Sequence, residues 1–151
     1  MPDLSPTGPW VEPWASDSLW RRAHLGDPLD LGRLAQREGA AGLLTAVERG
    51  GSAGVVALRA LAWADDAEFP LGRLCWMATR VSPVQTAEVL RAVHGVLVRP
   101  IGQCERMGGA GLADCASVLG GLGRHPALSD HARDLATSAC ARLNDRGYDC
   151  H

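Results

Sequence analysis

The stretch from Gly51 to Arg99 constrains the fold of this chain more than any other part of the sequence. Its apolar residues recur three and four positions apart, which is the spacing of one face of an α-helix. Two restarts interrupt this pattern: Pro70 after an acidic run, and Ser82-Pro83, where a capping hydroxyl precedes proline at a first helical position. The stretch therefore predicts three consecutive helices, joined by an acidic loop and a tight turn.

The composition also favours helices over sheets. The chain has 151 residues, enough for one domain with an ordinary core, and 46% of them are hydrophobic. Phe and Tyr each occur once, and Ile occurs only at position 101. Because β-branched and aromatic residues are scarce beside abundant Ala and Leu, and because no segment alternates as a strand would, we expect an all-α protein.

Helical spacing continues outside the central stretch. It predicts helices over 30–37, 40–49, 112–122 and 130–143. Ser52 and Ser129 are candidate N-caps, and Gly39 is a plausible stop between the first two helices. Glycines are frequent over residues 100–111, so this segment is expected to form a loop.

Residues 1–28 combine five prolines with Trp10, Trp14 and Trp20. Such a proline density prevents a long helix at the start, although Ala15 to His24 could form a helical turn capped by Ser16 or Asp17. Two interpretations remain open for the tryptophans. They cover the first helices as part of the core, or they form an exposed arm that docks on a partner, since Trp is enriched in binding hot spots.

Three segments that begin at a serine and continue rich in Ala and Leu suggest a repeat. They begin at Ser52, Ser82 and Ser129. This pattern resembles the HEAT-repeat family of α-solenoids over about residues 29–145. The residues that carry the resemblance are Ser52, Val55, Ala60, Leu61, Asp65, Asp66, Ser82, Pro83, Ala87, Leu90, Leu97, Asp130, Ala132, Leu135 and Ala136.

The resemblance implies a short right-handed α-solenoid of about three antiparallel helix pairs, which binds proteins on a helical face and shares no catalytic residues. The expected organisation is a Pro/Trp-rich arm over 1–28, a helical domain over 29–145 and a polar tail over 146–151. The chain departs from the family pattern because the usual Arg after the small apolar position in each first helix is missing and the repeat lengths are irregular.

The N-terminus has neither the basic segment nor the apolar segment of a signal peptide, and no run approaches the roughly 18 apolar residues that span a bilayer. We therefore expect a cytoplasmic protein without a membrane partner. There are five cysteines, an odd number, and in that compartment they are expected to be reduced thiols.

Metal binding or catalysis is one alternative function. Cys104, Cys115, His125 and His131 are zinc-type ligands, but their spacing lacks the close cysteine pair of structural zinc sites. Cys140, Cys150 and His151 form a second such set near the C-terminus. His94 lies on an apolar stripe with no partner at catalytic spacing, so it is interpreted as a core or boundary residue, and no cofactor is expected.

Nucleic-acid binding is a second alternative. All fifteen basic residues are Arg, and Arg21-Arg22 or Arg73 with Arg80 could contact phosphates, but the formal charge is −2 and acidic residues are spread throughout. The glycines at 108–111 lack the ending of a phosphate-binding loop.

The favoured hypothesis is thus a non-enzymatic module, such as an adaptor, scaffold or immunity-type protein, that binds another protein and has no small-molecule substrate. The expected contact residues are Trp10, Trp14 and Trp20 in the arm and Asp65, Asp66 and Glu68 in the acidic loop, where a charged edge would suit a basic partner.

Overall fold

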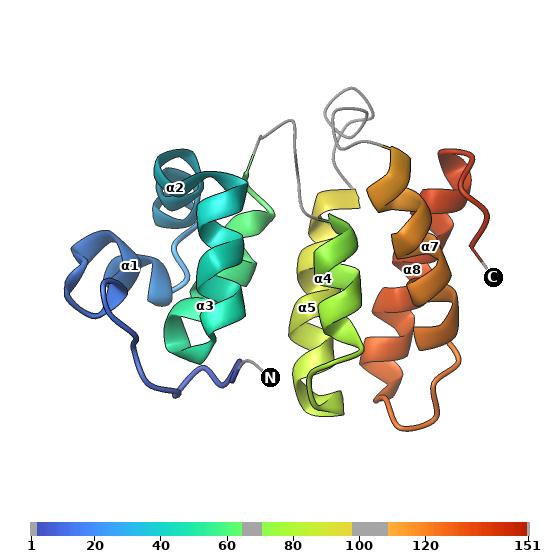
Figure 1. Ribbon diagram of the computed structural model, residues 1–151, viewed down its shortest axis with the longest axis horizontal. Coiled ribbons are helices and arrows are strands. Elements are labelled where there is room, and N and C mark those ends of the chain that lie inside the picture. The colour runs from blue at the N-terminus through green and yellow to red at the C-terminus, as the bar shows by residue number, and fades with distance from the viewer. Residues whose placement is uncertain (1–2, 65–70, 98–108, 151) are drawn as a thin grey trace. The chain divides into compact units, whose positions relative to one another are not determined.

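A computed structural model describes residues 3–64, 71–97 and 109–150 (Figure 1). Over these ranges the chain contains seven α-helices, one short 3-10 helix and no strand, which confirms the all-α prediction. The helices fall into two compact units, Met1–Asp66 and Ala67–His151. The helical domain expected over 29–145 is therefore divided between them, and the expected arm belongs to the first unit.

The first unit contains one 3-10 helix and three α-helices. Their bounds are η1 (Trp14–Ser16), α1 (Ser18–His24), α2 (Pro28–Arg49) and α3 (Gly51–Leu61). Asp17 caps α1 by accepting hydrogen bonds from the amides of Leu19 and Trp20, as the sequence predicted. The predicted stop at Gly39 is also present, because this residue has φ 72° and ψ 169° and separates two helical halves inside α2.

The core of the first unit lies between α2, α3 and the side of α1 that faces them. Every residue of α3 except Arg59 is buried, which explains why this helix is apolar all round. Apolar residues at helical spacing in α2 and α3 form the buried faces; they include Leu34, Leu43, Val55 and Leu61. Trp63 does not extend this face, because its side chain is half exposed beyond the end of α3.

Ser52 does not cap α3, contrary to the prediction. The helix begins at Gly51, and its first amides are occupied by the N-terminal segment, residues 3–11, which we call the strap. The Gly51 amide donates to the carbonyl of Asp3, and the Ser52 amide donates to the carbonyl of Pro9 at 3.2 Å. The Ser52 hydroxyl donates to carbonyls of the strap, including that of Pro6 at 3.1 Å. Backbone carbonyls thus replace the expected side-chain cap.

The second unit contains four described helices. Their bounds are α4 (Leu71–Ala78), α5 (Pro83–Leu97), α7 (Gly109–Leu122) and α8 (Asp130–Asp145). Pro83 begins α5 and Ser129 caps α8 through the Ala132 amide at 3.2 Å, as predicted. The loop expected over 100–111 is wrong at its C-terminal end, because α7 begins at Gly109. Packing of α7 against α4 and α8 outweighs the low helix propensity of glycine there. The rest of that segment lies outside the described residues.

Two helix pairs pack against each other in the second unit. The pairs α4–α5 and α7–α8 are in contact so that α4 lies along α7 and α5 lies along α8 (Figure 1). A guanidinium nitrogen of Arg91 in α5 is 3.4 Å from His131 at the start of α8, and Arg146 just after α8 donates to the Leu97 carbonyl at the end of α5 at 2.6 Å. These two contacts show that α5 and α8 run in the same direction.

The cysteines differ from the expectation of reduced thiols. Cys75 of α4 is bonded to Cys115 of α7, and Cys140 of α8 is bonded to Cys150 of the C-terminal segment. Of the five cysteines, only Cys104 falls outside the described residues. The expectation was derived from the presumed compartment, whereas the pairs are brought together by helix packing that the sequence spacing did not reveal.

Candidate interaction surface

Two of the three tryptophans that were expected to contact a partner lie in the core of the first unit. Trp20 is 0% exposed, and its ring nitrogen donates to a carboxylate oxygen of Glu38 at 3.2 Å. Trp14 is also buried, with its ring 5.6 Å from that of Trp20 and the guanidinium of Arg49 over its other side at 5.5 Å. The structure thus places both side chains where they close the core.

Trp10 lies nearer the surface, against α1. The guanidinium of Arg21 sits 5.0 Å from its ring centre, and the His24 ring meets it edge-on at 5.4 Å. One turn along the same face of α1 is Leu25, which is 85% exposed, and Leu29 at the start of α2 is 67% exposed. We call these residues, Trp10, Arg21, His24, Leu25 and Leu29, the α1 surface.

The α1 surface has the composition of a protein-binding patch. Large exposed aliphatic side chains are costly to leave in water, and here two of them lie at the end of α1 and the start of α2. The first, Leu25, is one turn from Arg21, which stacks on Trp10. Trp and Arg are the residues most enriched at interface hot spots. Leu25 follows α1 and Leu29 lies in the first turn of α2. Both precede the helix that the sequence predicted over 30–37, so they were visible as apolar residues outside any predicted helical face.

The acidic residues of the second expected contact region, Asp65, Asp66 and Glu68, lie outside the described residues. That prediction therefore stays a prediction. The described part of the second unit instead contains an exposed aromatic residue on α4. Trp76 of α4 is half exposed, and the guanidinium of Arg80 lies 4.7 Å from its ring centre. The four-residue spacing of this pair was the available signal.

Several arginines that could have contacted a nucleic acid are engaged with carboxylates. Arg37 contacts both Asp17 and Glu38 at 2.9 Å, and Arg22 lies 3.6 Å from Asp30. Arg21 and Arg80 are stacked on tryptophan rings. These arginines already have partners, whereas binding a phosphate backbone requires basic side chains clustered along a groove.

Two titratable groups have shifted pKa values. Burial raises the pKa of Asp17, but hydrogen bonds from the Trp20 amide, from Arg37 and from the Leu19 amide together hold it below its ordinary value. Burial lowers the pKa of His94, and the charge of Arg142 lowers it further. His94 is half buried on α5, in agreement with its interpretation as a boundary residue.

The proposed metal sets are not assembled over the described ranges. No group of three or more His, Cys, Asp or Glu side chains there could hold a metal ion. Cys115 is bonded to Cys75, His125 and His131 are exposed, and Cys104 lies outside the described residues. In the second set, Cys140 and Cys150 are bonded to each other.

Each described helix is too short or too polar to cross a bilayer. Comparison of the chain with protein-family models, with curated proteins and with solved structures found no match.

Proposed function

We propose that this chain is a non-enzymatic module that binds another protein, and that the α1 surface is its contact region. The observation that carries the proposal is the pair of exposed leucines, Leu25 at the end of α1 and Leu29 at the start of α2, with Leu25 one turn from the Arg21 that stacks on Trp10. These side chains lie on or next to α1. That helix is held in place by Trp20, which donates to Glu38, and is capped by Asp17. A pre-ordered patch of this kind loses little conformational freedom when it binds.

The packing of the second unit supports the solenoid part of the proposal. In the second unit the first helices of the two pairs, α4 and α7, lie together. The second helices, α5 and α8, also lie together and run in the same direction. This is the repeating arrangement of stacked helical hairpins. An up-and-down bundle would instead place only antiparallel helices side by side. We therefore propose a short HEAT-like solenoid, with a right-handed turn as the family resemblance implies.

The test compares capture of host proteins by the intact chain and by variants of equal stability. Immobilised wild type is exposed to host lysate beside the double variant Leu25→Ser with Leu29→Ser, and beside Trp10→Ala. The control is Val84→Ser, which removes an equally exposed aliphatic side chain from the second unit. Retained proteins are identified by mass spectrometry, and the melting temperature of each variant is recorded.

A partner that binds wild type and Val84→Ser, but not the two α1-surface variants, supports the proposal. Loss of most of the binding is expected, because truncation of a central hot-spot residue costs about 2 kcal/mol or more, roughly thirtyfold in affinity. Identical capture by all four proteins would show that the α1 surface is not the contact region. A wild type that retains nothing specific would remove the proposed function itself.

A further inference from the structure

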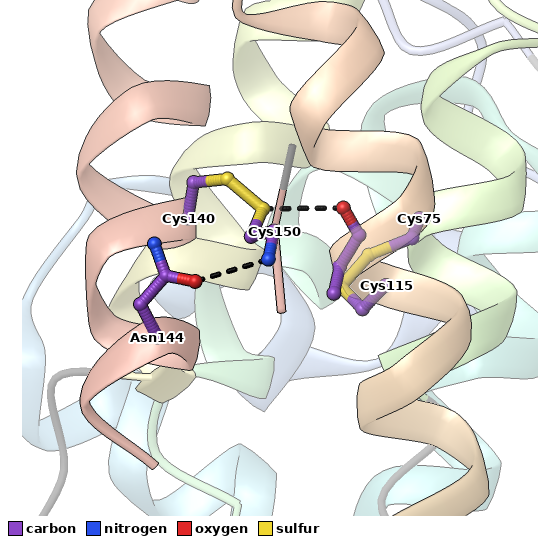
Figure 2. Close-up of a disulfide and its surroundings, with 6 residues drawn as sticks. Cys75, Cys115, Cys140, Asn144 and Cys150 are labelled. Atoms are coloured by element: carbon purple, nitrogen blue, oxygen red, sulfur yellow. Dashed lines mark hydrogen bonds between the residues drawn. A yellow bond between two sulfur atoms is a disulfide. The ribbon is translucent and has the colours of Figure 1, made fainter. Parts of the chain in front are cut away.

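The two disulfides of the second unit differ in how a thiol in solution could reach them (Figure 2). Cys75 and Cys115 are both 0% exposed, between α4 and α7. Cys140 is only partly buried, on the last part of α8, while its partner Cys150 is 8% exposed. A thiolate can attack only a sulfur that it can contact. Because Cys140 is the one of these four cysteines that is not buried, we expect its sulfur to be reached first.

Cys150 is held in place by contacts that do not depend on the bond to Cys140. Its amide donates to the side-chain oxygen of Asn144 at 3.0 Å, and its sulfur lies 3.1 Å from the carbonyl oxygen of Ala116 on α7 (Figure 2). A disulfide sulfur carries no proton, so this second contact becomes a hydrogen bond only when Cys150 is a thiol. The contacts with Asn144 and Ala116 would therefore keep a reduced Cys150 beside Cys140.

Reversible thiol exchange uses a disulfide that joins one accessible cysteine to a second cysteine held close to it. The Cα atoms of Cys140 and Cys150 are 5.5 Å apart, so the bond can form and break without moving α8. We propose that Cys140 is a site of reversible mixed-disulfide formation with a small-molecule thiol of the glutathione class, and that Cys150 is its resolving cysteine.

The proposed exchange balances in two steps. A small-molecule thiolate attacks the Cys140 sulfur, the protein disulfide breaks, and Cys150 leaves with the electron pair and takes a proton from solvent. The mixed disulfide on Cys140 then has two outcomes. A second small-molecule thiol reduces it and forms the small-molecule disulfide, or the Cys150 thiolate attacks Cys140, restores the protein bond and expels the small thiol.

The first measurement follows the order of opening in the full chain. Cys104→Ser is used as the background throughout, so that only the paired cysteines react. The oxidised protein is incubated with reduced glutathione, quenched with a maleimide and mapped by peptide mass spectrometry. Cys140 and Cys150 should become free at least about tenfold faster than Cys75 and Cys115, because a bond between two buried sulfurs must wait for local opening.

The second measurement uses matched single-cysteine variants in the same background. With Cys150→Ser, oxidised glutathione should leave one stable glutathionyl group on Cys140, because the resolving thiol is gone. With Cys140→Ser, the buried Cys150 should be modified at least about tenfold more slowly. Circular dichroism and melting verify that both variants fold.

Equal rates for the two variants, faster modification of Cys150, or earlier opening of the Cys75–Cys115 bond would each overturn the proposal. If either variant does not fold, the order of opening in the wild-type pairs decides by itself. The proposal does not depend on the α1 surface, so its failure leaves the proposed function intact.

Discussion

Single residues of this chain are constrained most strongly where the strap crosses the start of α3. Gly51 has φ 72°, a conformation that residues with a side chain rarely adopt. A Cβ atom at this position would also overlap the carbonyl oxygen of Pro9. Backbone conformation and space therefore both require glycine here, although the sequence alone marks Gly51 only as a helix boundary.

Gly51→Ala is expected to lower the free energy of unfolding by about 2–4 kcal/mol, since the left-handed conformation and the overlap both oppose a methyl group. The matched control is Gly32→Ala within α2, where a Cβ meets nothing within 4 Å. That change should stabilise the protein by up to about 1 kcal/mol through helix propensity. Urea unfolding of both variants measures the difference, and equal effects would contradict the described path of the strap.

The lowered pKa of His94 makes stability depend on pH in a defined direction. The unfolded chain binds a proton at the ordinary histidine pKa of about 6.5, before the folded chain does. Stability is therefore complete above that value and falls as the pH decreases through the lowered folded pKa. His94→Gln should flatten this fall in urea unfolding between neutral and mildly acidic pH, and Arg142→Gln should reduce it. An unchanged slope in His94→Gln would show that other groups cause it.

At the scale of elements, sequence spacing was sufficient for helices whose ends are marked locally. Gly39, Pro83 and Ser129 each act on residues within one turn, so their roles are visible in the printed sequence. Ser52 shows why other predictions were wrong: its hydroxyl bonds to carbonyls of the strap, which lies more than forty residues away. The burial of Trp20 against Glu38 and the Cys75–Cys115 pair also depend on residues far apart in the sequence.

The link between α1 and α2 depends on Asp17, which caps α1 and pairs with Arg37. Asp17→Ala should lower the free energy of unfolding by about 1–2 kcal/mol, and Asp17→Asn by less, because the amide oxygen still caps the helix.

Folding lowers the pKa of Asp17. The contribution of this residue to stability is therefore present above the ordinary Asp pKa of about 3.9, and it is lost as the pH falls through the lowered pKa of the folded state. Unfolding in urea at neutral and acidic pH checks both statements. A variant Asp17→Asn as unstable as Asp17→Ala would assign the effect to the ion pair instead of the cap.

At the scale of the whole molecule, covalent crosslinks are confined to one of the two compact units. Both disulfides lie in Ala67–His151. In the described part of Met1–Asp66, the strap and the buried side chains of Trp14 and Trp20 complete the core instead. The Cys75–Cys115 bond joins residues 40 positions apart and links the two helix pairs of its unit. Closing a loop of this length restricts the unfolded chain substantially.

Replacing Cys75 and Cys115 together by Ala should lower the stability of the second unit by about 4 kcal/mol, the amount expected for loss of such a crosslink. Amide hydrogen exchange measures each unit by itself, and α5 and α8 should lose protection. Leu61→Ala is the reciprocal control, because Leu61 is buried in the first unit and its truncation should cost about 2–5 kcal/mol there. Loss of protection confined to the first unit in the double cysteine variant would contradict this assignment.

The strap also has a consequence for how the protein is made. Leu4 is buried against Gly54, so a side chain translated well before α3 is covered only after α3 has been synthesised. Until then its apolar surface has no native contact, and the carbonyls of Asp3, Pro6 and Pro9 are hydrated. A ribosome that pauses before Gly54 is added would hold a nascent chain whose strap is still open to chaperones.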